Sequence, residues 1–291
     1  NSGADLDIDG SGVDIELAGS FSNSGTLTSS GETITLDGTG NVNFGATTNA
    51  NTNLTFSKSS GTVTTTGDIT VNNILVSSSS FAVDGETVVA ATVDIDNSGT
   101  IDISAGELEC TGKLDHDGNL TMSGGTLDIN GEYESENSAT ESITGGTITC
   151  AGEWDGDGDD AFTPTGGTVI LDGNTDRILR LHSSSNFYNL TISNTSGDVH
   201  PYNTVDVDGD LTISSGADLD IDNQNENITI GGNFSNSGTL TSDARTITFD
   251  GTGTVNCGAL SNSQIILYVS KSSGSVTTTG NISVDELRVT S

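Results

Sequence analysis

The chain alternates apolar and polar residues over short runs that are bounded by Gly, Ser, Asn or Asp. Apolar pairs two residues apart recur through positions 1–78: Leu6 and Ile8, Ile15 and Leu17, Ile34 and Leu36, Val42 and Phe44, Leu54 and Phe56, Ile69 and Val71. A period of two places such side chains on one face of a β-strand. The pattern therefore predicts many short strands that are joined by tight turns.

The alternating pattern itself repeats. Residues 1–78 return without a gap as residues 214–291, which defines a long repeat of about 213 residues. Of the 78 aligned pairs, 46 are identical. Residues 79–166 are the most divergent part of the chain, and we see no linker in them. A long repeat of fixed length is typical of solenoids, in which each unit buries its apolar face against its neighbours.

A shorter period is clearest between residues 106 and 173. The strings GELECTG, GTLDING, GTITCAG and GTVILDG begin at Gly106, Gly125, Gly146 and Gly167. These starts are about twenty residues apart, a step that fits one coil of a parallel β-helix. We expect two columns of side chains to point inward and stack from coil to coil: Leu108, Leu127, Ile148 and Val169 in one, and Cys110, Ile129, Cys150 and Leu171 in the other.

These periods predict an all-β fold, a parallel β-helix that forms one continuous β-solenoid over residues 1–291. With coils about 4.8 Å apart, about 14 coils would make a rod on the order of 65–70 Å long. The sequence opens inside one copy of the long repeat and closes inside another. We therefore expect either a segment of a longer tandem array or a subunit that associates with itself end to end.

Composition and charge narrow the choice of partners. The chain has 38 Gly, 2 Pro and 4% aromatic residues, and 7 Lys and Arg stand against 41 Asp and Glu, for a net charge of −34. Such an acidic surface repels nucleic-acid phosphates and anionic lipid headgroups, so we expect no nucleic-acid partner. No apolar run approaches the roughly 20 residues of a membrane-spanning helix, so we expect no direct membrane insertion.

Several strings resemble the repeats of a known class of proteins. GDLTISSGADLDID, GGNFSNSGTLT, TITFDGTG and FYNLTIS are similar to repeats of large secreted bacterial or archaeal surface proteins with β-solenoid folds. They are similar in kind to filamentous-haemagglutinin and autotransporter-passenger regions. The resemblance implies an extracellular stalk, fibre or adhesin at the cell surface, and it carries over no site residues.

Runs of aspartate are the first candidate for chemistry. Asp5, Asp7 and Asp9 recur as Asp218, Asp220 and Asp222, and stacked like charges repel one another. The densest run is WDGDGDDA, with Asp155, Asp157, Asp159 and Asp160. It begins like a calcium-binding EF-hand loop, but Asp160 replaces the glycine and Gly166 the final glutamate of that motif. A Ca²⁺ site and a solvated acidic face both remain open.

Aromatic and cysteine residues offer less specific signals. Tyr133 and Trp154 share a column, where they form either an exposed platform for a glycan ligand or a stacked rib at a corner. Cys110, Cys150 and Cys257 have no zinc-type spacing, and we interpret them as small buried apolar residues.

The sequence gives little indication of an enzyme active site. His116, His182 and His200 are scattered, and no spacing compels His116 to join Asp155 and Asp157 in an active site. We therefore expect a protein that is not an enzyme and needs no cofactor except, on one interpretation, Ca²⁺. The expected function is an extracellular structural repeat that forms a stiff acidic rod. The alternatives are an adhesin that binds a glycan or cell-surface ligand and, more distantly, a carbohydrate-active β-helix enzyme.

Overall fold

The computed structural model describes residues 4–9, 12–136, 139–158, 161–222, 224, 226–258, 260–262 and 264–290. These residues form β-strands, turns and irregular segments, with no helix among them. The chain divides into two compact units, 1–148 and 149–291. The described residues contain no helix of the length and apolarity that crossing a bilayer requires.

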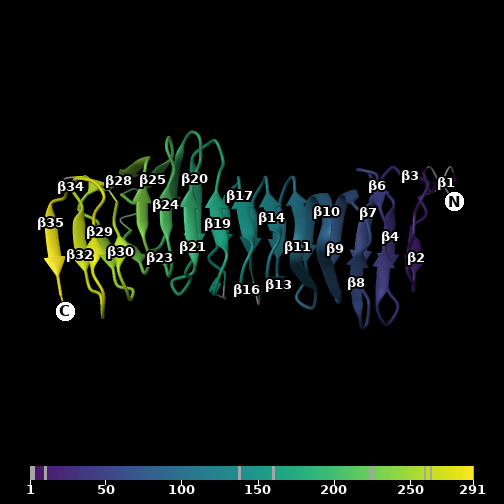
Figure 1. Cartoon of the computed structure of the whole chain (residues 1–291). Coiled ribbons are helices and arrows are strands. Elements are labelled where there is room, and N and C mark those ends of the chain that lie inside the picture. The colour runs from purple at the N-terminus through teal and green to yellow at the C-terminus, as the bar shows by residue number, and fades with distance from the viewer. Residues whose placement is uncertain are drawn as a thin grey trace. The chain divides into compact units, whose positions relative to one another are not determined.

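Most strands are short in both units, whereas β10 and β11 of the first unit have 16 and 11 residues (Figure 1). The strands of the first unit are β1 (Asp5–Asp7), β2 (Ile15–Leu17), β3 (Thr26–Thr28), β4 (Thr33–Leu36), β5 (Val42–Phe44), β6 (Thr47–Thr48), β7 (Asn53–Phe56), β8 (Thr62–Thr65), β9 (Ile69–Val76), β10 (Ser80–Ile95), β11 (Thr100–Cys110), β12 (Leu114–His116), β13 (Asn119–Met122), β14 (Thr126–Ile129), β15 (Tyr133–Ser135) and β16 (Thr140–Ile143). Strand β17 (Thr147–Cys150) contains the boundary between the units.

The second unit is built in the same way. Its strands are β18 (Trp154–Gly156), β19 (Thr168–Leu171), β20 (Arg177–Leu181), β21 (Asn189–Ile192), β22 (Asp198–Pro201), β23 (Val205–Val207), β24 (Leu211–Ile213), β25 (Asp218–Asp220), β26 (Ile228–Ile230), β27 (Phe234–Asn236), β28 (Thr239–Thr241), β29 (Thr246–Phe249), β30 (Val255–Asn256), β31 (Leu260–Ser261), β32 (Ile266–Val269), β33 (Val276–Thr277), β34 (Ile282–Ser283) and β35 (Glu286–Val289).

Each strand pairs in parallel with a strand about one coil away. In the first unit one coil contributes β12, β13 and β14. Strands β12 and β13 pair with β15 and β16 of the next coil, and β14 pairs with β11 of the coil before it. In the second unit β19 pairs with β21 and β29 with β32, again in parallel. The prediction of an all-β parallel β-solenoid with a coil of about twenty residues is confirmed.

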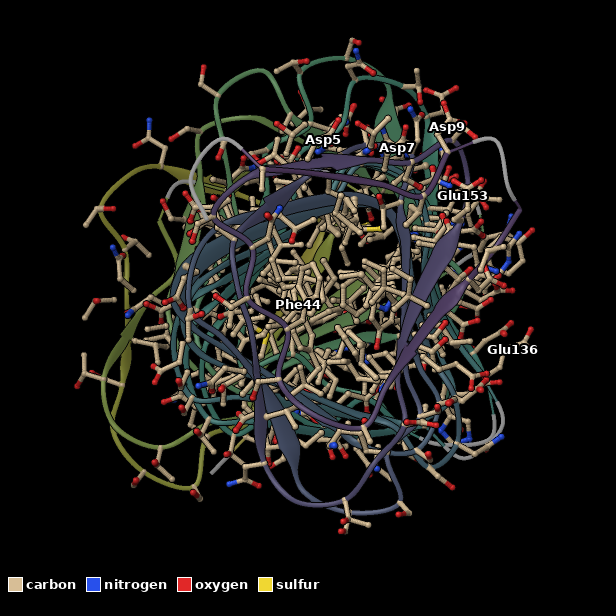
Figure 2. The ribbon with its side chains drawn as sticks, turned by 90° about the vertical axis from the view of Figure 1, so that its right-hand side faces the viewer. Asp5, Asp7, Asp9, Phe44, Glu136 and Glu153 are labelled. Carbon is tan, nitrogen blue, oxygen red and sulfur yellow. The ribbon has the colours of Figure 1, made fainter. Side chains whose placement is uncertain are left out.

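The interior of the coils contains the predicted apolar columns. All eight residues of the two columns that begin at Leu108 and Cys110 are buried, and Leu108 pairs with Leu127 as Cys110 pairs with Ile129. Figure 2 shows Phe44 inside the first unit and Asp5, Asp7 and Asp9 on its outside. Alternation therefore separates an apolar interior from an acidic exterior within each strand.

The two copies of the long repeat share one pairing register. Equivalent residues pair with equivalent partners in the two units. In the first unit the pairs are Leu6–Leu27, Ile34–Leu54 and Val42–Val63, and the corresponding pairs of the second unit are Leu219–Leu240, Ile247–Leu267 and Val255–Val276. The repeat in sequence is therefore a repeat of structure. Cys110, Cys150 and Cys257 are buried, as the sequence predicted.

Candidate functional site

The acidic exterior of the first unit contains a lysine that joins carboxylates of two neighbouring coils. Lys113 Nζ lies 3.2 Å from Asp115 Oδ2, and it also forms an ion pair with Glu134 on the next coil. Asp115 and Glu134 occupy paired positions of β12 and β15. A cation between stacked carboxylates offsets the repulsion that the sequence leads us to expect.

In the second unit Arg180 likewise contacts two carboxylates, here of the same coil. Its Nη1 donates hydrogen bonds to Asp155 Oδ2 at 3.0 Å and to Glu153 Oε2 at 3.2 Å. Its guanidinium carbon lies 5.7 Å from the centroid of the Tyr202 ring, within the range of a cation–π contact. A fixed positive charge therefore already compensates this pair of carboxylates.

The predicted Ca²⁺ site is described only in part. Asp155 is bound by Arg180, and Asp157 is exposed. Asp159 and Asp160 lie outside the described residues. Since two of the four carboxylates lie outside the described residues, the calcium interpretation stays a prediction.

The predicted aromatic platform lies in the interior. Tyr133 is 0% and Trp154 1% exposed, so neither ring presents a face to a saccharide at the surface. The hydroxyl of Tyr133 donates to Glu141 Oε1 at 3.0 Å. Trp154 packs edge-on against Phe162 and Phe187 at centroid distances of 5.1 and 5.8 Å. These geometries support the alternative interpretation of aromatic residues in the core.

A buried polar cluster surrounds His116 in the first unit. Glu141 pairs with Leu120 of the coil before it and so places a carboxylate at a position of the apolar column. Its Oε1 lies 3.4 Å from His116 Nδ1 and accepts a hydrogen bond from Ser135 at 3.4 Å. His116 Nε2 is buried and has no hydrogen-bond partner among the described residues. The sequence did not predict this cluster.

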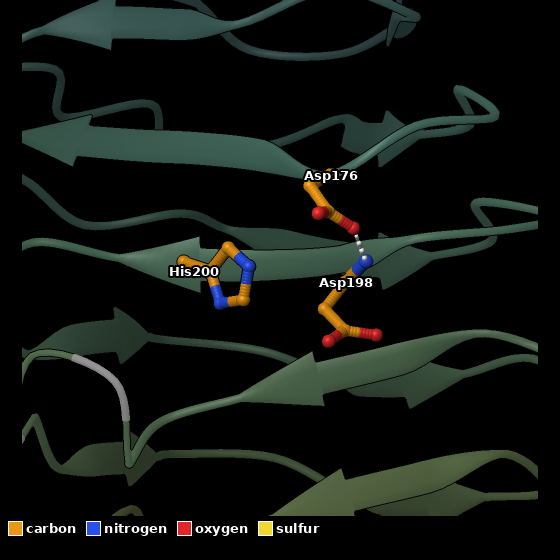
Figure 3. A group of neighbouring side chains, drawn as sticks. All are labelled: Asp176, Asp198 and His200. Atoms are coloured by element: carbon orange, nitrogen blue, oxygen red, sulfur yellow. Dashed lines mark hydrogen bonds between the residues drawn. The ribbon is translucent and has the colours of Figure 1, made fainter.

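A second group, on the outside of the second unit, contains the residue types that bind metal ions. Asp176, Asp198 and His200 each offer a ligand atom, and these atoms all lie within 4.8 Å of one another (Figure 3). Asp176 directly precedes β20, and Asp198 and His200 lie on β22. Since Arg177 pairs with Val199, the strand register places Asp176 beside Asp198. The Asp198 N–H donates to Asp176 Oδ1 at 3.2 Å.

Further carboxylates extend this group into the next coil. Asp198 pairs with Asp218 of β25, and His200 Nδ1 lies 3.5 Å from Asp220 Oδ2. Burial raises the pKa of Asp218, and the charges of Asp198 and Asp220 raise it further, while a hydrogen bond from the Thr241 hydroxyl opposes the shift. Negative charge is therefore concentrated around one imidazole.

Asp218 and Asp220 belong to an acidic run in the sequence, but the run itself does not connect them with His200. The residues of the group come from three separate segments of the sequence, which belong to successive coils: DRILRL, DVHPYN and DLDIDN. The one signal that could have found the group is an alignment of these three segments by strand register. Coil lengths vary, so the period alone does not fix that alignment.

The core of the second unit opens at its last described strands. A cavity of about 730 Å³ is lined by apolar side chains that include Leu267, Val269, Val276, Ile282, Leu287 and Val289. Leu287 and Val289 are 59% and 68% exposed.

Comparison of the chain with protein-family profiles, with curated protein sequences and with solved structures found no match.

Proposed function

We propose that this chain is an extracellular structural repeat protein that forms a stiff acidic rod in a cell-surface fibre, filament or stalk. The observation that carries the proposal is the shared register of the two repeat copies, in which equivalent residues such as Leu27 and Leu240 pair with equivalent neighbours. Because successive copies use the same pairing register, a further coil can stack on the array with the contacts that the existing coils already make.

The energetics of a solenoid favour a mechanical role. Each coil is held by parallel backbone hydrogen bonds and by apolar burial against the coils on either side, so stability accumulates along the axis. Acidic and hydroxyl side chains cover the outside and keep neighbouring rods apart by charge repulsion. The resemblance of its repeats to those of secreted surface proteins supports an extracellular location.

The proposed partner is a further coil, supplied by a longer array or by a second copy of this chain. The exposed apolar side chains of Leu287 and Val289 support this partner, because the apolar lining of the open cavity would be covered by a coil stacked on β35. A parallel strand would also pair with the open edge of β35, as β35 itself pairs with β32.

Electron microscopy of the purified chain over a range of concentrations tests the proposal. We expect filaments of constant width that lengthen with concentration, both with and without a chelator. Discrete particles that do not change with concentration would contradict end-to-end assembly. Specific retention of the chain on a glycan array would instead favour the adhesin alternative.

A further inference from the structure

We propose that Asp176, Asp198 and His200 form a binding site for one divalent transition-metal ion of the Zn²⁺ type, with Asp220 as a positioning residue. The proposal is independent of the rod function. It concerns residues that the sequence had not grouped and a ligand chemistry different from the predicted Ca²⁺ site.

The donor set carries the choice of metal. Ca²⁺ and Mg²⁺ take oxygen ligands, whereas an imidazole nitrogen beside two carboxylates suits Zn²⁺ and its transition-metal neighbours. The three ligand atoms already lie within 4.8 Å of one another. Zinc bonds of about 2.0–2.2 Å bring tetrahedral ligands to about 3.4 Å from each other, so closure needs side-chain rotations that move each atom by about 1 Å.

The strand geometry permits those rotations. Val199 lies between Asp198 and His200, and both Val199 and Leu179 of the neighbouring strand are fully buried in the core. The ligands themselves are partly or fully exposed, so they can move without disturbing apolar packing. The site also joins two successive coils, since Asp176 belongs to one and Asp198 with His200 to the next.

The orientation of the imidazole is a separate observation. Nδ1 of His200 faces Asp220 Oδ2 at 3.5 Å, and in Figure 3 the other ring nitrogen lies on the side of the ring nearer Asp176 and Asp198. Histidines that bind metal ions commonly hold their second nitrogen against a carboxylate, which fixes the tautomer and the ring plane. Asp220 can supply that contact from the neighbouring strand.

The charge balance distinguishes this group from the two acidic groups that contain Lys113 and Arg180. Lys113 compensates Asp115 and Glu134, and Arg180 compensates Glu153 and Asp155. Within the described part of the chain, no lysine or arginine forms an ion pair with Asp176 or Asp198. A bound divalent cation would supply there the positive charge that a side chain supplies elsewhere.

Titration of the chelator-treated chain with Zn²⁺, followed by calorimetry and native mass spectrometry, tests the site. We expect one Zn²⁺ per chain, lost in His200→Asn and retained in the matched control His182→Asn. Asp176→Asn should weaken binding at least tenfold, whereas Asp206→Asn, which removes an acidic residue outside the group, should leave it unchanged. Asp220→Asn should weaken binding by about 10- to 100-fold without changing the stoichiometry.

A competition measurement separates a specific site from general attraction to an acidic surface: a large excess of Ca²⁺ should fail to displace Zn²⁺. Far-ultraviolet circular dichroism and melting of the metal-free variants establish that they fold. Retention of the Zn²⁺ stoichiometry and affinity by folded His200→Asn, displacement by Ca²⁺, or absence of binding to the parent chain would each overturn the proposal.

Discussion

Val76 and Val289 occupy equivalent positions of the long repeat, yet Val76 is 0% exposed and Val289 is 68% exposed. Val76 pairs with Phe56 on one side and with Ile95 on the other. Val289 pairs with Val269, and in the part of the chain that the structure describes β35 has that strand alone as its neighbour. The burial of a core residue therefore depends on having a coil on each side.

This difference predicts opposite effects of one substitution at the two positions. Val289→Asp should change the melting temperature of the dilute chain by little, because the new carboxylate stays in water, but it should abolish end-to-end assembly. Val76→Asp places a carboxylate in the core and should unfold the surrounding coils. Melting curves and sedimentation velocity measure the two effects. Unchanged assembly of Val289→Asp would contradict the proposal that a further coil binds this end.

The turn glycines predict a second contrast. Gly40 and Gly61 both have positive φ, at +76° and +89°, but an added Cβ at Gly40 meets no atom within 4 Å, whereas one at Gly61 overlaps the carbonyl of Gly40. Gly40→Ala should cost about 1–2 kcal/mol, the usual penalty for a left-handed L-residue. Gly61→Ala should cost more, because the stacked backbone must also move. Denaturant unfolding measures both, and equal losses would show that stacking does not constrain the turn.

The apolar columns could be predicted from sequence because alternation and the regular coil step suffice to place Leu127 and Cys110 inside. The polar interior could not be predicted in the same way. Glu141 stands where its neighbour Leu120 is apolar, and only the carboxylate's contacts with His116, Tyr133 and Ser135 explain its burial. The burial of Tyr133 and Trp154 likewise depends on which side of a corner each ring points to.

The group around His200 could not be predicted because it depends on exact register. The step along the chain from Asp176 to Asp198 is longer than the step from Asp198 to Asp218, although each step leads to the paired position of the next coil. An error of a single position moves a side chain from the outside to the inside of a strand. Only the pairing of β20, β22 and β25 settles which carboxylates face the imidazole.

Like charges on the outside of the second unit predict that removal of one of them stabilises the chain, by an amount that depends on pH. Burial raises the pKa of Asp206, and the charges of Asp208 and Asp250 raise it further. Since the folded-state pKa lies above the unfolded-state value, this residue contributes less stability as the pH rises through that interval. Asp206→Asn should therefore stabilise the chain by about 0.2–1 kcal/mol at pH 7. The gain should vanish near pH 3, where the carboxyl is protonated in both states.

Denaturant unfolding of both proteins at pH 7 and pH 3 measures this gain. Added salt should reduce it at pH 7, because screening weakens the repulsion between exposed charges. Asp208→Asn, which removes one of the repelling charges instead, should also stabilise the chain at pH 7. Destabilisation by Asp206→Asn at pH 7 would show that its carboxylate has a favourable partner that outweighs the repulsion.

Glu32 predicts the opposite dependence on pH. The Ser30 N–H donates to Glu32 Oε2 at 2.6 Å, and the Ser29 hydroxyl donates to the same oxygen at 3.0 Å. The hydrogen bond from the Ser30 backbone is the largest cause that lowers the pKa of this carboxyl in the folded state. Its stabilisation is therefore complete above the unfolded-state pKa and is lost as the pH falls through the folded-state value.

Replacement of Glu32 by glutamine keeps the shape of the side chain but removes the charge that strengthens both hydrogen bonds. Glu32→Gln should therefore lower the denaturation midpoint at pH 7, and the difference from the parent chain should shrink as both are acidified below pH 4. Arg245 occupies the equivalent position in the second copy of the repeat, so that unit lacks the same carboxylate. Hydrogen exchange should accordingly show the pH-dependent loss at the turn around Ser30 and not at the turn around Asp243. Equal loss at both turns would assign the effect to the acidity of the whole chain and not to Glu32.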